Sequence, residues 1–368
     1  MKKYTALMLA LVLMLGCVVS ASAATTINPD TLSYPVRTPA STANNPVIEG
    51  ESPFTGLKAE TAGEQNALEN YTPILVVYDN NIDGFMHTGI GAADIVFQVP
   101  NQSTGNNKQL ALFSTHFPEN AGGTRSARMT AFPFALALDA AFVSAGTPPI
   151  DDITVGVDFW RHEWNYSLDN KFFDTTSGRN YKHREGSGDT GLMAHLQEIR
   201  NNYLIPRKIE FEKRPFLFAD EPLTRGEIAN VIDMKFYASS TDTSTNQNSD
   251  CTFHYEEGMG YTREMAKGIE YDKKTMEYLY FANVIVMRVQ ISSKAVMGTG
   301  YLFYKDQLTG SGKADIFQNG RYIRGSWYRD KKNSRLIFLD DEGNELKFQR
   351  GKSYIVVNNS NCVVTYDE

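Results

Sequence analysis

The dense succession of short strand-like segments in the last third of the chain restricts its fold more than any other feature. From Cys251 onward, runs of β-branched and aromatic residues alternate with clusters of polar turn residues, a pattern typical of antiparallel sheets. Asn319-Gly320 lies between two such runs and favours a two-residue hairpin, because both residue types tolerate positive φ. The segments expected to form strands are 254–255, 261–263, 283–291, 300–304, 314–317, 321–327, 335–339 and 354–357.

The middle of the chain combines strand-like and helix-like patterns. Residues 74–78 are a continuous apolar run, Ile-Leu-Val-Val-Tyr, which predicts a strand buried on both faces. Residues 126–145 are rich in Ala, Leu and Phe at helical spacing and predict a helix that Pro133 kinks or restarts. Two further strands are expected at 93–99 and 109–114, and an amphipathic helix at 190–201.

Together these patterns predict an α+β fold with two domains. We expect an N-terminal domain with a mixed α/β sheet over residues 71–215 and a β-rich C-terminal domain over residues 216–368. The chain has 368 residues, of which 42% are hydrophobic. That is enough for two cores, because single cores usually stop growing beyond about 250–300 residues.

Residues 1–23 have the layout of a secretory signal peptide. Lys2 and Lys3 precede an apolar run over residues 6–16 that is too short to span a bilayer. Ala21-Ser22-Ala23 fits the pattern of ordinary signal peptidase, whereas Met14-Leu15-Gly16-Cys17 resembles a bacterial lipobox, in which the cysteine is acylated. The chain is therefore expected to be exported, and either secreted or held by a lipid on Cys17 at the outer face of the cytoplasmic membrane.

The segment after the signal peptide, residues 24–70, is polar and rich in Pro, Thr, Ser and Asn. Such a composition buries too little apolar surface to offset the entropy cost of ordering the chain. We therefore predict a flexible tether between the signal peptide and the folded body.

Charge and motifs exclude several functional classes. The formal net charge is −7 at pH 7 and no long basic run is present, so nucleic-acid binding is not expected. The six histidines are scattered and form no HExxH pattern, so we expect no metal site. The sequence also lacks a P-loop and a Gly-x-Ser-x-Gly nucleophile motif, and we expect no cofactor. The lack of an assembled catalytic set favours a protein that is not an enzyme.

Two cysteines remain once Cys17 is removed or acylated, namely Cys251 and Cys362. Thiols in an exported protein are able to oxidise to a disulfide. The pair either forms such a bond or stays as two free thiols.

The strongest candidate for a binding site is Gly122-Gly123-Thr124-Arg125-Ser126-Ala127-Arg128. A glycine pair before a helix start allows a ligand to approach the backbone, Ser126 is able to cap the helix, and free N–H groups at a helix N-terminus attract anions. Arg125 and Arg128 add forked donors that suit carboxylate or phosphate. The competing interpretation is a capped helix whose arginines pair with acidic residues of the same domain.

Two further groups of residues are weaker candidates. Asp79 and Asn80 follow a buried strand, and the carboxyl ends of strands often line clefts, although a turn cluster that satisfies its own backbone would look the same. Arg179 and His183 lie in a glycine-rich loop. A histidine beside charged groups is able to transfer protons, but an exposed charged loop is the simpler interpretation.

Eight segments resemble, in order and spacing, the YerB-like family of bacterial envelope lipoproteins, whose biochemical function is unknown. They are SPFTGLKAE at 52–60, PILVVYDN at 73–80, GIGAADIVFQ at 89–98, GGTRSAR at 122–128, YTREMAKG at 261–268, ANVIVM at 282–287, NGRYIRGSWYRD at 319–330 and GNELKFQRGKSYIVV at 343–357. The resemblance implies an α+β domain and then a β-rich domain behind a lipobox. Polar groups usual in the family are replaced at Gln98, at 144–148 and at 182–184, so a family-wide activity is in doubt for this chain.

Three functions remain open. The first is a non-catalytic envelope module that binds an anionic glycan, peptide or protein partner and touches the membrane only through its lipid. The second is a wall-active or glycan-active hydrolase that uses Asp79 and His183 in one cleft with Arg125 or Arg128. The third is a purely structural partner protein.

Overall fold

The computed structural model describes residues 24–80, 87–101, 107–146, 171–175, 182–184, 191–236, 249–296, 299–359 and 362–367. The expected signal peptide with Cys17 lies outside these residues, and so does Arg179. Within the described ranges, no helix has both the length and the apolar character that a membrane crossing requires.

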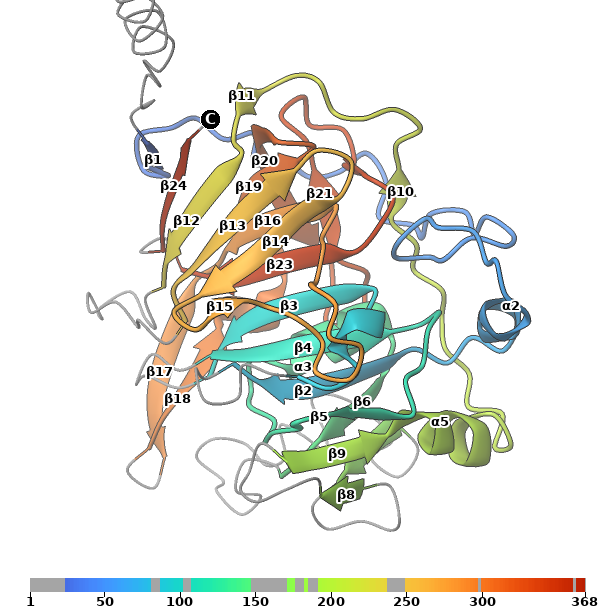
Figure 1. The fold of residues 1–368 in the computed structure, drawn as a ribbon. Helices are drawn as coiled ribbons and strands as arrows, with labels where there is room; N and C mark the ends of the chain where they lie inside the picture. Colours follow the sequence, from blue (N-terminus) through green and yellow to red (C-terminus); the bar gives the residue numbers. More distant parts are fainter. Residues whose placement is uncertain are drawn as a thin grey trace, which may run out of the picture.

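Strands from both halves of the chain form one large mixed sheet (Figure 1). In spatial order they are β11 (Glu227–Ile228), β20 (Arg321–Arg329), β19 (Gly310–Gln318), β16 (Asn283–Arg288), β23 (Ser353–Asn358), β3 (Ile95–Pro100), β4 (Asn107–Phe113), β2 (Ile74–Asp79), β6 (Ala141–Ser144) and β7 (Phe172–Asp174), with β21 (Ile337–Leu339) paired to β20. β23 pairs in parallel with β3 and so joins the two halves. The predicted boundary at residue 215 therefore does not separate two sheets.

A second sheet covers one face of this central sheet. Its strands, in spatial order, are β1 (Thr25–Ile27), β24 (Val363–Asp367), β12 (Val231–Lys235), β13 (Cys251–Glu256), β14 (Gly260–Met265) and β15 (Gly268–Ile269). Buried residues such as Tyr78, Phe253 and Tyr354 fill the space between the two sheets. The opposite face packs against α3 (Phe132–Leu138). Because most of the described regular structure is strand, the predicted α+β class is confirmed only in part.

Smaller elements complete the fold. A small sheet contains β5 (Asn120–Gly122), β9 (Leu192–His195) and β8 (Lys182–Arg184), and a two-stranded pair contains β10 (Leu217–Phe218) and β22 (Lys347–Phe348). A hairpin of β17 (Ile291–Val296) and β18 (Thr299–Tyr304) projects from the body in Figure 1. The helical segments are α2 (Ala62–Glu69), η2 (Ile90–Ala92), α5 (Leu196–Glu198), η5 (Ile199–Leu204) and η6 (Lys305–Leu308). The helix predicted over 190–201 therefore starts as a strand and becomes helical at Leu196.

The predicted hairpin at Asn319-Gly320 is confirmed. Gln318 of β19 pairs with Arg321 of β20, and the two residues between them have φ of 51° and 66°. These positive values fit a turn whose twist matches that of the two strands. The predicted strands around residues 74–78, 93–99 and 109–114 are confirmed as β2, β3 and β4.

The long helix predicted over 126–145 is wrong. Only α3 is helical, and it begins with Pro133 in its first turn, where the missing N–H of proline costs nothing. Asp139 then takes up a left-handed conformation with φ of 45°, and β6 follows in parallel with β2. Apolar residues at helical spacing were ambiguous here, because a buried helix followed by a buried strand has the same composition.

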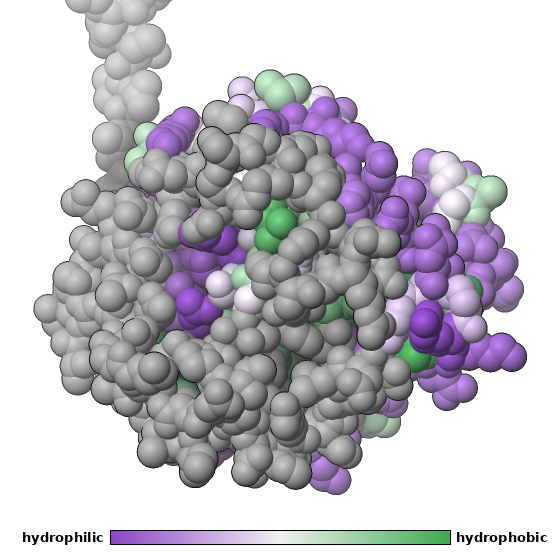
Figure 2. Space-filling view, turned by 90° about the horizontal axis from the view of Figure 1, so that it is seen from below, coloured by the Kyte–Doolittle hydropathy of each residue, from purple (hydrophilic) through white to green (hydrophobic). Residues whose placement is uncertain are grey.

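The tether predicted over 24–70 is also wrong for the described residues. β1 pairs with β24 at the chain end, and Asn44 Nδ2 donates to Glu212 Oε1 at 2.6 Å. α2 begins with a capping box formed by Thr61 and Glu64, and its surroundings present a mostly hydrophilic surface (Figure 2). Long-range hydrogen bonds to the body compensate for the low apolar content that had suggested disorder.

Cys251 and Cys362 are both buried and are free thiols in this structure. Burial raises the pKa of Cys251 and raises the pKa of Cys362 to about 12, so neither thiol is activated for oxidation. We expect a maleimide reagent to leave both residues of the mature protein (24–368) unlabelled in buffer and to label both in denaturant, as read by intact mass. Absence of labelling in denaturant without reductant, with labelling after reduction, would show that a disulfide forms.

Candidate functional site

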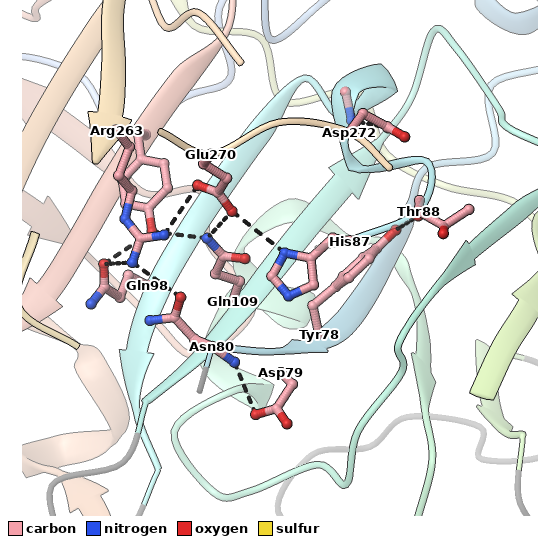
Figure 3. A network of polar contacts seen from close by, with 12 residues as sticks. Tyr78, Asp79, Asn80, His87, Thr88, Gln98, Gln109, Arg263, Glu270 and Asp272 are labelled. Atoms are coloured by element: carbon pink, nitrogen blue, oxygen red, sulfur yellow. Dashed lines mark hydrogen bonds and ion pairs between the residues drawn. The ribbon is translucent and has the colours of Figure 1, made fainter. Parts of the chain in front are cut away.

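Polar side chains gather where β2 and β3 end and β4 begins. Asp79 is the last residue of β2 and Asn80 follows it, and both are almost fully buried. Successive side chains of a strand point to opposite faces, and these two contact different partners on the two faces. Figure 3 shows them pointing away from each other.

On one face, Asp79 contacts Lys108 and Arg125, and we call these two residues together with the neighbouring Arg128 the basic cluster. Arg125 Nε lies 2.8 Å from Asp79 Oδ2, and Lys108 Nζ lies 3.4 Å from Asp79 Oδ1. The segment that carries Arg125 runs beside β2, because its backbone N–H donates to the carbonyl of Val77 at 2.9 Å. Asp79 and Arg125 therefore lie together, as the competing interpretation of an arginine paired with an acidic residue of the same domain expects.

The electrostatics of the basic cluster are dominated by Lys108, whose side chain is only 9% exposed. Burial lowers its pKa most, Asp79 opposes the shift, and Arg125 and Arg128 add to it, so that the pKa falls to about 8. Lys108 and Arg125 thus contact the carboxylate of Asp79, and Arg128 lies close enough to Lys108 to lower its pKa. Such an arrangement attracts anions.

Ser126 does not cap a helix. α3 has Ala131 at its N-cap, with no side-chain hydrogen bond there, and Ser126 lies in the preceding irregular segment. The predicted anion site at a helix N-terminus is therefore wrong, because Pro133 shifts the helix start beyond the arginines. Their position beside β2 comes from backbone pairing instead.

On the other face, Asn80 belongs to a buried polar network that also contains Arg263, Glu270, Gln109 and His87 (Figure 3). Arg263 donates to Glu270 Oε2 at 3.1 Å and to Asn80 Oδ1 at 3.0 Å. Gln109 Nε2 donates to Glu270 Oε1 at 2.9 Å. Burial alone would raise the pKa of Glu270, but Arg263 and His87 bring it down to about 2. This carboxylate therefore stays ionised over the physiological range.

His87 is a polar residue that the sequence did not single out. It is 1% exposed, its Nδ1 lies 3.4 Å from Glu270 Oε1, and its Nε2 has no hydrogen-bond partner within the part of the chain that the structure describes. Asp272 holds the segment next to it by accepting from the backbone N–H of Gly89 and Gly91. No local motif marked His87, because its partner Glu270 comes from a distant part of the sequence.

The remaining predicted residues are not brought into this site by described contacts. His183 lies on β8 opposite Met193, and its side chain is outside the described part of the chain, as is Arg179. No group of three or more His, Cys, Asp or Glu residues is suited to hold a metal ion among the residues that the structure describes.

Two sequence profiles of one family match most of the folded body. Residues 54–198 match "Protein of unknown function (DUF3048) N-terminal domain" and residues 240–355 match "Protein of unknown function (DUF3048) C-terminal domain". The chain belongs to the DUF3048 family. The resemblance to YerB-like proteins is thereby confirmed.

Relatives of this DUF3048 protein share its fold along most of its length. "Putative lipoprotein YerB" of Bacillus subtilis (strain 168) is 23% identical over 320 residues, which cover 83% of this chain and 85% of that protein. The crystal structure of YerB protein from Bacillus subtilis matches with a TM-score of 0.67 and 22% identity, covering 85% of this chain and 99% of the other. The similarity supports the fold and leaves the biochemical role to the residues of the site.

Proposed function

We propose that this DUF3048 protein is exported, is anchored by a lipid on Cys17, and binds an anionic glycan, peptide or protein partner of the envelope without catalysing a reaction on it. The name of its Bacillus relative, a lipoprotein, supports the anchor. The observation that best supports binding is the basic cluster, in which Lys108 and Arg125 contact Asp79 and Arg128 lies near Lys108.

The contacts of Asp79 argue for a structural role of this carboxylate. Arg125 and Lys108 both approach it, and it is 1% exposed. A carboxylate held by two cations is a weak base and a weak nucleophile, because its charge is already stabilised. This arrangement favours binding over the alternative of a hydrolase that uses Asp79 with His183.

We expect the soluble body, residues 24–368 without Cys17, to co-sediment with purified cell-wall sacculi, and the Arg125→Ala, Arg128→Ala double variant to bind about tenfold or more weakly, because it loses two charge-assisted donors. The matched control removes two lysines elsewhere, Lys331→Ala with Lys332→Ala; the side chain of Lys331 is 75% exposed. Binding should fall as salt rises, since screening weakens exposed charges.

The pH dependence gives a second readout. Because the pKa of Lys108 is about 8, the cluster loses one positive charge as the pH rises from about 7 to 9, and binding should weaken over that range. If neither the wild type nor the variants sediment with sacculi, the wall glycan is not the partner. If the double variant binds as well as the lysine control, the basic cluster is not the binding site.

A further inference from the structure

Arg329, at the end of β20, is a buried guanidinium without an acidic partner. Its side chain is 0% exposed. Its Nε donates to Ser334 O at 3.1 Å and its Nη1 reaches Gln307 O only at 3.5 Å, while Nη2 has no hydrogen-bond partner. No carboxylate lies within ion-pair distance of Arg329 in the described part of the chain. Burial, together with the nearby charge of Arg214, lowers its pKa to about 9.

Three other arginines that are 5% exposed or less, Arg263, Arg288 and Arg335, do have such partners. Arg263 pairs with Glu270 at 3.1 Å, Arg288 with Asp315 at 2.7 Å and Arg335 with Glu345 through two hydrogen bonds. An uncompensated buried charge costs several kcal/mol. Arg329 therefore lacks the anion that the fold supplies to comparable residues.

A cavity of about 490 Å³ lies next to Arg329. Arg329 and Trp327 point to the same face of β20 and pair with Gly310 and Gly312 of β19. Trp327 and the two glycines line the cavity. Its walls combine apolar side chains with cationic ones and with one acidic side chain, that of Asp306. The lining residues used here are Val36, Val289, Lys305, Leu308, Lys313 and Trp327.

The turn formed by η6 separates the cavity from Arg329. Asp306, Gln307 and Leu308 all have positive φ, of 50°, 55° and 64°. Non-glycine residues rarely adopt this conformation, because it brings Cβ close to the following carbonyl oxygen. Gln307 supplies the long contact to Arg329, while Leu308 is buried on the cavity side. The turn is thus strained and only weakly bonded to the guanidinium beneath it.

We propose that this cavity binds a carboxylate at the end of a short apolar or peptide-like group, and that the turn 305–308 shifts to let Arg329 pair with it. Tyr304, which also lines the cavity, offers a second donor, because its hydroxyl is buried and has no hydrogen-bond partner among the described residues. A carboxylate matches the fork of one guanidinium. The apolar walls suit the attached group, and the site is separate from the basic cluster.

The test uses Trp327 as a reporter. The protein has three tryptophans, so the mature chain with Trp160→Phe and Trp164→Phe emits from Trp327 alone. N-acetyl-leucine, N-acetyl-leucinamide and inorganic phosphate are titrated separately, with calorimetry on the wild type as a second measurement. We expect N-acetyl-leucine to change the emission and to bind about tenfold or more tightly than the neutral amide.

Two variants separate binding from folding. Arg329→Met should lose the preference for the carboxylate while its melting temperature stays equal or rises, because an uncompensated buried charge is removed. Gln307→Gly should raise the melting temperature and weaken binding about fivefold, because glycine relieves strain in the closed turn and so favours the state without ligand. A structural role alone predicts that Arg329→Met lowers the melting temperature and that no probe binds.

Equal binding of the acid and the amide, equal or tighter binding of phosphate, or undiminished binding of N-acetyl-leucine by Arg329→Met would each overturn the proposal. So would the absence of binding by the wild type in both measurements. Because this site does not include Arg125 or Arg128, none of these results bears on the sacculus experiment.

Discussion

Replacing Glu270 by Gln is expected to lower the free energy of unfolding by about 3–5 kcal/mol, because it leaves Arg263 charged and buried without its counterion. Both side chains of the pair are 0% exposed, so solvent does not screen the loss. Urea unfolding of the mature protein, followed by far-UV circular dichroism, measures the difference.

The matched control is Glu264→Gln, which removes a surface carboxylate that is 46% exposed and lies beside His254; we expect a change below about 0.5 kcal/mol. The double variant Arg263→Met, Glu270→Met should be less destabilised than Glu270→Gln, because it removes both charges. Equal stability of the wild type and Glu270→Gln would show that the pair contributes nothing to the fold.

The pair of Arg263 and Glu270 also makes the free energy of unfolding depend on pH in the acid range. The pKa of Glu270 is about 2 in the folded state and 4.5 without the protein environment, so its contribution is fully present above about pH 5 and is lost as the pH falls toward 2. In Glu270→Gln this part of the acid dependence should disappear, and the two unfolding curves should converge at low pH.

Replacing Phe54 by Ala is expected to cost about 3–5 kcal/mol of stability. Phe54 lies in the segment that the composition marks as a tether, yet its side chain is 0% exposed. Its ring packs edge-on against Phe216 at 5.7 Å between centroids, and the carbonyl before it accepts from the backbone N–H of Phe216 at 2.9 Å. Truncation would leave a cavity in the core.

Ile48→Ala in the same segment is the control, because Ile48 is 55% exposed and should change stability by less than about 0.5 kcal/mol. Thermal and urea unfolding of both variants measure the difference. If Phe54→Ala were as harmless as Ile48→Ala, residues 24–70 would behave as a tether, and the packing against Phe216 would be incidental.

Local sequence signals predicted the strands and their turns well. Residues 74–78 are apolar without interruption and became β2, which is buried along its whole length. Asn319-Gly320 set the register of β19 and β20, because few residue pairs accept positive φ at both turn positions. Such features depend on neighbours within a few residues, so the sequence is sufficient to read them.

Local sequence signals gave the wrong structure where a segment is ordered by residues that are distant in the sequence. Residues 24–70 look disordered by composition and are ordered by pairing with β24 and by contacts of Phe54. Residues 141–144 look helical and form a strand because β2 offers an edge for parallel pairing. Tertiary contacts overrode local preference in both cases.

The candidate site was predicted only in part, because its contacts also join residues that are far apart in the sequence. Asp79 and Arg125 were both named from the sequence, as the end of a strand and as part of a glycine-rich segment, but only backbone pairing beside β2 brings them within 2.8 Å. His87, Glu270 and Arg263 carried no local signature. The sequence by itself determined the strands, the turns and the list of polar candidates. The tertiary structure alone decided that both halves share one sheet and which charges are buried together, because pairing between distant strands leaves no trace in local periodicity.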